Sequence, residues 1–331
     1  MEPSVSTDII EARNLTRDYK IAKRDEGAKY VFVRKYETIH AVKAIDFTVK
    51  PGETVGFVGP NGAGKSTAIK MMTGILVPTS GTIRVLGRDP FASRKQNALE
   101  IGVVFGQRSQ LWWELPISDA FTLLRKLYRV PKEKYEANLK LYKEYLDLES
   151  IWNQAVRQLS LGQRMRAEIA AAILHNPPLL FLDEPTVGLD IVAKRQIRAF
   201  IKRLNTDYGT TVILTSHDIK DIEEVCERIM LINNGTLTVD CPLAELRSRF
   251  QANSVVTVNF EKPLAAFDMP GVTGAPEKDG LTWRFEIDKN ITTMGHLVFE
   301  LSKTAEIVDM QAANPAVEDI IHDLYINENT L

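Results

Sequence analysis

The sequence predicts an α/β fold in which a partly parallel sheet is covered by helices, followed by a smaller α+β domain. Two observations in the first part of the chain lead to this prediction. Short apolar runs alternate with helical patterns, and a glycine-rich turn directly follows one of those runs. Near-continuous apolar runs are typical of strands buried on both faces of a parallel sheet. The third observation is a change of texture after about residue 245, where strand and helix patterns mix without such a turn.

Five apolar runs define the predicted central sheet. They are TVGFV at 54–58, IGVVF at 101–105, LLFL at 179–182, TVILT at 211–215 and IMLI at 229–232. Ahead of the fourth run, apolar residues recur with the i, i+3, i+4 and i+7 spacing of an amphipathic helix: Ile197, Phe200, Ile201 and Leu204. Strands that alternate with helices in this way favour a layered α/β domain.

Two further stretches interrupt this alternation. Residues 20–37 are polar and rich in Lys, Arg and Tyr, and they separate two strand-like pieces, so we expect an insertion on the surface. Residues 115–148 have helical periodicity with Pro116 and Pro131 as breakers. This pattern predicts a helical subdomain over about residues 115–170.

The rest of the chain forms the predicted second domain. SVVTVNF and TWRFEI alternate as strands do, and MGHLVFELSK and AVEDIIHDLY have helical spacing. We therefore predict one domain over residues 1–245 and an accessory α+β domain over 246–331, without assigned catalytic residues. A length of 331 residues agrees with two domains, because a single core usually stops growing near about 250–300 residues.

Composition and sequence patterning argue against several classes of protein. Acidic and basic residues number 43 and 41, so net charge gives no reason to expect nucleic acid as a partner. Cys226 and Cys241 lack paired zinc-site spacing and are expected to be inert thiols in a reducing cytosol. The N-terminus has no secretory pattern, and no segment approaches the roughly 18 uninterrupted apolar residues of a membrane span. If the protein acts at a membrane, another chain must cross it.

The run GPNGAGKST at residues 59–67 matches a phosphate-binding loop. In such a loop, glycines let backbone N–H groups curl around phosphates, a lysine reaches the β- and γ-phosphates, and a hydroxyl holds Mg²⁺. We assign these two roles to Lys65 and Ser66, and contact with the α-phosphate to Thr67. The nucleotide-binding residues predicted in this run are Gly59, Pro60, Asn61, Gly62, Ala63, Gly64, Lys65, Ser66 and Thr67.

Three acid–base residues stand at predicted strand ends. Asp183 and Glu184 follow LLFL, which places two carboxylates at the tip of a buried strand beside the phosphate loop. We expect Asp183 to hold the Mg²⁺ shell, and Glu184 to orient and deprotonate the attacking water. His217 ends the strand TVILTS, where its imidazole can hydrogen-bond a γ-phosphate.

A further turn, LSLGQ at residues 159–163, precedes a helical stretch in which Met165, Ile169, Ala172 and Ile173 share a face. Ser160 and the amides around Gly162 would lie at a helix N-terminus, which is a favourable anion site. Alone, such a turn is also an ordinary helix cap.

In this order and spacing, these segments resemble the ATP-binding cassette (ABC) family, the nucleotide-binding subunits of ABC transporters. The resemblance covers roughly residues 8–245. It implies a P-loop NTPase domain with a helical subdomain, ATP and Mg²⁺ as ligands, and hydrolysis of ATP to ADP and phosphate. In that family two subunits meet head to tail, so that each γ-phosphate touches the Walker A loop of one and the signature motif of the other.

The resemblance also implies a role for each segment. Residues 59–67 are Walker A, 159–163 the signature, and 188–190 the D-loop; Glu184 is the catalytic glutamate and His217 the switch histidine. Beyond Walker A, the residues implied at the nucleotide are Tyr36, Gln107, Ser160, Gly162, Gln163 and Asp190. Those implied at the metal are Ser66, Gln107 of the Q-loop and Asp183.

Two departures from the family pattern leave alternatives open. The signature usually reads LSGGQ, and here Leu161 replaces its first glycine, although Ser160 and Gly162 survive. The insertion ahead of Ala41 blurs the aromatic residue that stacks on adenine, for which Tyr36 is favoured over Tyr19.

Two assignments near residue 110 also have competing interpretations. Gln107 is preferred to Gln110 as the Q-loop glutamine, because Leu111 then occupies the family's usual apolar position. Trp112 and Trp113 either form a cleft for a coupling helix of a membrane subunit or fill a local core.

The whole chain looks most like the ATPase subunits of ABC-2-type exporters, some of which end in a pattern like NPAVEDIIHDLY, residues 314–325. We therefore expect an energy-coupling ATPase, peripheral at the cytoplasmic face of the cell membrane. Its expected partners are transmembrane permease subunits and a second ATP-binding subunit, identical or paralogous. The alternative is a soluble ABC ATPase in translation or DNA maintenance.

Overall fold

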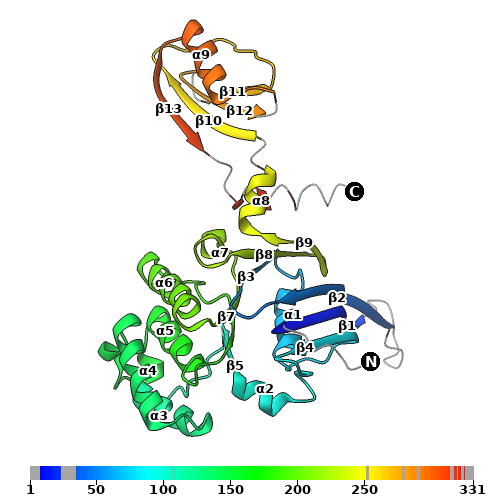
Figure 1. Ribbon diagram of the computed structural model, residues 1–331, viewed down its shortest axis with the longest axis vertical. Helices are drawn as coiled ribbons and strands as arrows, with labels where there is room; N and C mark the ends of the chain where they lie inside the picture. Colours follow the sequence, from blue (N-terminus) through cyan, green and yellow to red (C-terminus); the bar gives the residue numbers. More distant parts are fainter. Residues whose placement is uncertain are drawn as a thin grey trace, which may run out of the picture. The chain divides into compact units, whose positions relative to one another are not determined.

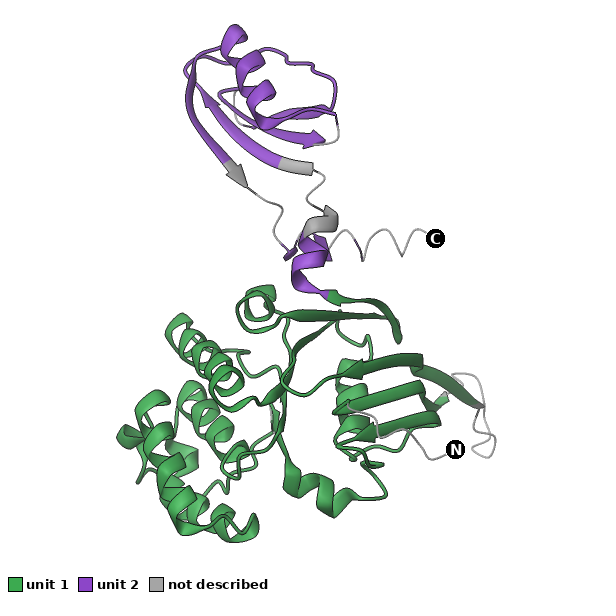
Figure 2. Cartoon of the chain, in the orientation of Figure 1, with its two compact units in different colours: residues 1–241 green, residues 242–331 purple. Residues whose placement is uncertain are grey.

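The computed structural model describes residues 8–23, 35–106, 108–250, 253–277, 280–288 and 291–313, with 317, 318, 320, 321 and 324. The chain divides into two compact units, residues 1–241 and 242–331 (Figure 2). The boundary expected after residue 245 falls inside helix α8 (Leu243–Phe250), which belongs to the second unit.

The first unit is built on a six-stranded sheet with strand order β5-β6-β7-β3-β8-β9. The strands are β3 (Thr54–Val58), β5 (Ile101–Phe105), β6 (Leu179–Asp183), β7 (Thr211–Thr215), β8 (Arg228–Asn233) and β9 (Thr236–Pro242). Neighbouring pairs from β5 to β8 are parallel. The α/β prediction is confirmed, and its five strands lie within one residue of the observed ends because their side chains are almost all buried.

Four helices gather on one side of this sheet (Figure 1). They are α3 (Ile117–Leu127), α4 (Lys132–Tyr145), α5 (Leu161–Ala172) and α6 (Ile191–Tyr208). Helices α3 and α4 begin immediately after Pro116 and Pro131, the two residues predicted as breakers. The predicted stripe of α6 is buried along its length, which is what fastens this helix to the domain.

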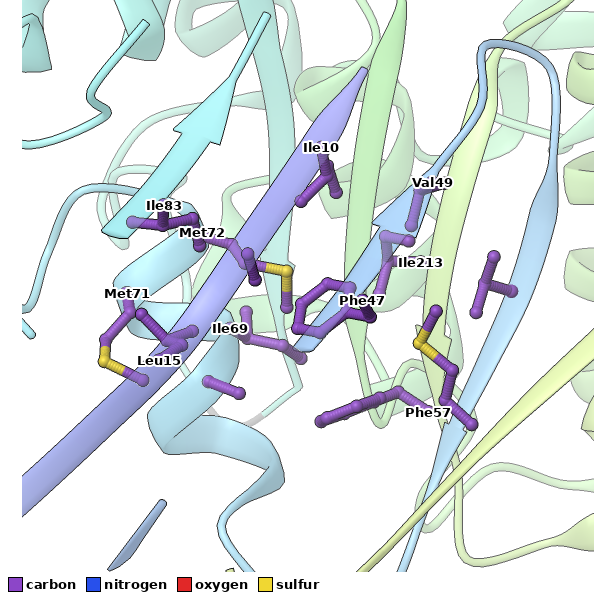
Figure 3. Packing of buried hydrophobic residues seen from close by; sticks show 14 of the residues in the cluster. Ile10, Leu15, Phe47, Val49, Phe57, Ile69, Met71, Met72, Ile83 and Ile213 are labelled. Carbon is purple, nitrogen blue, oxygen red and sulfur yellow. The ribbon is translucent and has the colours of Figure 1, made fainter. Parts of the chain in front are cut away.

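The other side carries helix α1 (Lys65–Met72) and an antiparallel sheet of order β2-β1-β4. Its strands are β1 (Ile10–Lys23), β2 (Lys35–Val49) and β4 (Ser80–Val85). Leu15, Phe47, Phe57, Ile69 and Met72 belong to one buried cluster that joins this sheet, α1 and the central strands (Figure 3). This core holds β3 and α1, and therefore the turn between them, in fixed positions.

The polar stretch 20–37 is a lengthened hairpin where it is described. Strand β1 continues to Lys23 and β2 begins at Lys35, and the two pair in register from Lys20↔Thr38 to Lys23↔Lys35. Residues 24–34 of the expected insertion lie outside the described residues.

The second unit is an antiparallel sheet of order β11-β12-β10-β13 with helix α9 (Met294–Thr304). Its strands are β10 (Asn253–Phe260), β11 (Val272–Glu277), β12 (Thr282–Asp288) and β13 (Ile307–Ala313). Alternate residues of β10 and β12 share a buried cluster with Leu297 and Leu301 of α9, which explains the period-two pattern of both strands. Half of the predicted helix over residues 316–325 lies outside the described residues, and those described there are helical.

Neither unit supplies a transmembrane segment in its described part: no helix there combines the length and the apolar character that a bilayer requires.

Candidate nucleotide site

The turn between β3 and α1 forms a phosphate loop because its glycines allow a backbone that other residues resist. Gly64 has φ +112°, and a Cβ added there would stand 2.3 Å from the carbonyl oxygen of Ala41. At Gly59 an added Cβ would be 2.3 Å from the carbonyl oxygen of Ile232. The loop is thus pressed against β2 and β8, with the N-terminus of α1 behind it.

Lys65, the first residue of α1, lies across this loop. It is only 5% exposed, and its Nζ donates to the carbonyl oxygens of Gly59 and of Pro60, the latter at 3.0 Å. Burial lowers the pKa of Lys65, while the nearby carboxylates of Glu184 and Asp183 act in the opposite direction. The ammonium is therefore held where an anion can replace carbonyl oxygens as its partner.

Asp183, at the end of β6, meets hydroxyl groups from two other elements. Ser66 Oγ of α1 is 3.5 Å from Asp183 Oδ1, and Thr215 Oγ1 donates to the same oxygen at 2.7 Å. Thr215 is the partner of Asp183 in the parallel register of β6 and β7, so the sheet itself creates this contact. The sequence prediction overlooked Thr215, although its place at a strand end gave a signal.

The donor set fits a magnesium ion. A hydroxyl and a carboxylate oxygen 3.5 Å apart are hard ligands, and Mg²⁺ usually binds one or two protein oxygens besides phosphates and waters. The described residues contain no cluster of three or more His, Cys, Asp or Glu side chains suited to a metal. The site suits a metal that arrives with a phosphate-bearing ligand.

Glu184 follows Asp183 with an unusual backbone. Its φ of +56° lies in the left-handed region, which costs a non-glycine residue about 1–3 kcal/mol. Its N–H group donates to both the carbonyl oxygen and Oγ1 of Thr215, at 3.1 and 3.0 Å, and these bonds offset part of that cost. Glu184 Oε1 lies 2.6 Å from Nε2 of His217, which places the two predicted catalytic side chains in direct contact.

A cavity of about 510 Å³ opens beside these residues. Its lining includes Ser66, Asp183, Glu184, Leu161, Arg164 and Gly188. Leu161, which stands where the family usually has glycine, approaches Gly188 so closely that an added Cβ there would be 2.9 Å from its Cδ2. Ser160 is not among the described residues that line this cavity.

Ser160 begins helix α5 as its N-cap residue. Ser160 Oγ accepts from the N–H of Gln163 at 3.2 Å, and Gln163 Oε1 accepts from the N–H of Ser160 at 2.9 Å. This reciprocal pair is a capping box, and it leaves Ser160 exposed at the surface. Asp190 caps α6 in the same manner, with Oδ1 accepting from the N–H of Ala193 at 2.8 Å, and is also exposed.

Similarity to known proteins identifies the family of this chain. Residues 42–187 match the family described as ABC transporter. The linearmycin resistance ATP-binding protein LnrL of Bacillus subtilis is 30% identical over 290 residues, which cover 86% of this chain and 93% of LnrL. The chain belongs to the ATP-binding cassette family. It is an ATP-binding subunit of an ABC transporter and an ATPase, as the sequence predicted, and the translation or DNA-maintenance alternative is not favoured.

Other relatives agree over shorter spans. The Nod factor export ATP-binding protein I of Rhizobium etli is 37% identical over 194 residues, covering 59% of this chain and 61% of that protein. ABC transporter A family member 1 of Dictyostelium discoideum is 31% identical over 230 residues, and the chain spans only 26% of its length. The dimeric cassette MJ0796, solved in a post-hydrolysis state with ADP and Pi, has a TM-score of 0.59 at 30% identity and covers 71% of this chain and 98% of its own.

The segment around the predicted Q-loop residue Gln107 is anchored by hydrogen bonds on both sides. Gln107 lies outside the described residues. Before it, Gly106 N donates to the carbonyl oxygen of Asp183 at 2.8 Å. After it, the competing residue Gln110 is bound to helix α5, where its Nε2 donates to the carbonyl oxygen of Glu168 at 3.0 Å and its N–H to Glu168 Oε2 at 3.1 Å.

Glu168 is a buried carboxylate that the sequence prediction missed, and it anchors the residues after Gln107. It is buried within α5, also accepts a hydrogen bond from Ser109 Oγ, and carries a pKa raised by burial. The signal in the sequence was weak, because a single Glu in an apolar helix stretch does not indicate its partner.

The two tryptophans do not fill a core. Trp112 and Trp113 are 44% and 50% exposed, so that interpretation is wrong for this cassette. The guanidinium of Arg164 lies 5.5 Å from the ring centroid of Trp113, which ties the exposed ring to α5.

The two candidate adenine-stacking tyrosines occupy different levels of the β1–β2 hairpin. Tyr36 is 61% exposed and pairs with Ala22, whereas Tyr19 pairs with Ile39, nearer Ala41 and the phosphate loop. The guanidinium of Arg17 covers the Tyr19 ring at 4.8 Å. Tyr36 is therefore highly exposed, while Tyr19 is nearer the loop and its ring is partly covered by Arg17.

Proposed function

We propose that this cassette drives export through separate transmembrane subunits, and that it does so as one of two ATP-binding subunits that close around two ATP molecules. One observation carries the proposal. The hydrolytic residues converge beside the phosphate loop, whereas Ser160 and Asp190 cap their helices at the exposed surface. A second subunit would bring its own exposed signature turn to the phosphates.

In this proposal the phosphate loop binds and orients ATP. The amides of residues 59–67 surround the β- and γ-phosphates, and the Nζ of Lys65 exchanges the carbonyl oxygens of Gly59 and Pro60 for phosphate oxygens. Ser66 and Asp183 hold Mg²⁺, which supplies positive charge to the phosphates when bound. Thr215 keeps the Asp183 carboxylate in that position through its hydrogen bond.

Glu184 and His217 then act as a pair on the attacking water and the γ-phosphate. Glu184 Oε1 accepts the water's proton, while His217 hydrogen-bonds the γ-phosphate. Because His217 Nε2 lies 2.6 Å from Glu184 Oε1 here, the imidazole must exchange its carboxylate partner for a phosphate oxygen as ATP binds. Release of phosphate returns His217 to Glu184, which links the chemical state of the site to the loop that carries the histidine.

Export and a place at the cytoplasmic face of the membrane are inferred from relatives such as the Nod factor export protein. Trp112 and Trp113, exposed beside the Q-loop, are suited to receive a short helix of the membrane subunit. Tyr36 is the proposed adenine-stacking residue, with Tyr19 as its competitor.

Purification of the full chain from a detergent extract of its own cells tests this function. We expect a polytopic membrane protein to copurify and to carry ATPase activity with it. Copurification with ribosomes or chromosomal DNA, without any polytopic protein, would overturn the transporter assignment.

A further inference from the structure

A buried carboxylate behind the catalytic pair joins the two loops that carry it. Asp221 of helix α7 (Ile219–Val225) is 0% exposed. Its Oδ2 accepts hydrogen bonds from Thr186 Oγ1 and from Ser216 Oγ, the latter at 2.6 Å. Its Oδ1 accepts from Nε of Arg198 at 2.6 Å.

These partners stand directly beside the catalytic residues in the sequence. Thr186 lies two residues after Glu184, and Ser216 immediately precedes His217. Both hydroxyl-bearing residues are buried, so water cannot replace Asp221 as their acceptor. One carboxylate therefore fixes the start of the Glu184–Asp190 loop relative to the loop that presents His217.

The surrounding charges make this carboxylate stable in a buried position. Arg198 donates from Nε to Asp221 and from Nη1 to Glu224 at 2.9 Å, while Lys194 Nζ pairs with Asp218 at 2.7 Å. Asp218 also lies 3.9 Å from Nη2 of Arg198. Buried charges persist when they are paired and fully hydrogen-bonded, which is the case for Asp221.

We propose that Asp221 is a positioning residue that holds Glu184 and His217 in register for hydrolysis. This inference rests on the roles proposed above for Glu184 and His217. Ser216 Oγ both donates to Asp221 and accepts from the N–H of Asp218 at 3.0 Å, so its hydroxyl orientation is determined. Asp221 thereby fixes the two loops that carry Glu184 and His217 relative to one another through Thr186 and Ser216.

Replacing the carboxylate disturbs this arrangement in a specific way. Three donors converge on Asp221, and the amide of Asp221→Asn offers only one acceptor oxygen. If the amide oxygen takes the position of Oδ1, the hydroxyl groups of both loops lose their acceptor; if it takes that of Oδ2, the NH₂ group faces the Nε–H donor of Arg198 and pushes the side chain out of place. A displacement of about 1 Å in a catalytic group can reduce turnover by on the order of 10²-fold.

The experiment compares four variants of the full chain in its transporter complex. Asp221→Asn replaces the carboxylate that accepts from both loops, and Thr186→Val removes one of its hydroxyl donors. Glu224→Gln changes the other, exposed carboxylate that pairs with Arg198. Thr186→Ser keeps the hydroxyl group. We expect kcat to fall about 10- to 100-fold in the first two variants, with KM for ATP within about 3-fold of wild type, and near-normal kcat in the other two.

A thermal melt of each variant excludes loss of fold as the cause. Folded Asp221→Asn and Thr186→Val variants with unchanged kcat would overturn the inference, as would a loss in Glu224→Gln or Thr186→Ser equal to theirs. Glu184→Gln separates this failure from a failure of the proposed function. If Glu184→Gln loses turnover while Asp221→Asn does not, only the positioning role is wrong.

Discussion

The two ends of the nucleotide site differ in how completely this chain builds them. At the sheet edge, Asp183, Glu184 and His217 are fixed by contacts between different elements, including the bond from Thr215 to Asp183 at 2.7 Å and the Glu184–His217 contact at 2.6 Å. At the signature, Ser160 and Gln163 bond to each other in a local capping box, and Ser160 is exposed at the surface. In the proposed function, the first region is a finished hydrolytic half-site, and the second is a surface that another subunit completes.

Replacing the proposed general base tests the finished half most strongly. Glu184→Gln keeps the size of the side chain but removes its ability to accept a proton. We expect a fall in kcat on the order of 10²–10⁴-fold with ATP binding retained, measured as phosphate release and as nucleotide affinity. Glu133→Gln on the exposed start of α4 is the control, and near-normal turnover by Glu184→Gln would remove Glu184 from its role.

Changing Ser160 tests the unfinished half. Asp caps a helix as well as Ser does, but it brings negative charge to the place where a partner's γ-phosphate would bind. We expect Ser160→Asp to melt at the wild-type temperature while turnover falls by about 10²-fold.

Thr293→Asp, at the N-cap of α9 in the second unit, is the matched control and should leave turnover unchanged. If Ser160→Asp hydrolyses ATP normally, the signature turn does not meet a phosphate, and the contrast between the two regions loses its meaning.

Replacing the proposed adenine-stacking residue should have a smaller effect on ATP turnover. Loss of an aromatic stacking partner is worth about 0.5–1.5 kcal/mol, so we expect Tyr36→Ala to raise KM for ATP by about 2- to 10-fold with kcat unchanged. Tyr19→Ala is the paired variant. A rise in KM confined to Tyr19→Ala would transfer the role to Tyr19. A KM for ATP equal to that of wild type in both variants would exclude stacking on either ring.

The smallest effect concerns Glu168, which fastens the residues after Gln107 to α5. Burial raises its pKa above its ordinary value of 4.5, so the folded state holds this proton more tightly than the unfolded state does. Its contribution to stability is therefore present below pH 4.5 and is lost as pH rises through the raised pKa.

As pH rises from 4.5 through the raised pKa of Glu168, we expect the free energy of unfolding of wild type to decline relative to that of Glu168→Gln. Chemical denaturation of both proteins across the pH range measures the difference. A difference that does not vary with pH would show that Glu168 has the same pKa in the folded and unfolded states.

Much of the fold was predictable because burial on both faces leaves a direct mark on sequence. TVGFV and TVILT are buried at every position, and both strands were placed to the residue. The glycine loop was predictable because few residue types allow its backbone. The capping role of Ser160 followed from its place before a helical stripe.

What the sequence did not reveal depends on tertiary neighbours. Nothing in the residues around Asp221 indicates that Thr186 and Ser216 converge on it, because Ser216 precedes it by 5 residues but Thr186 by 35. The left-handed backbone of Glu184 could not be predicted, because that position is not a glycine. The choice between Tyr36 and Tyr19 stayed open because the lengthened hairpin changes the spacing on which the family pattern relies.

The structure of the Glu184→Gln protein loaded with ATP and Mg²⁺ tests the central claim most directly. We expect a head-to-tail pair in which the Ser160 hydroxyl of one subunit lies within hydrogen-bond distance of the γ-phosphate bound by Lys65 of the other. A nucleotide-loaded assembly in which every Ser160 is remote from every nucleotide would contradict the account.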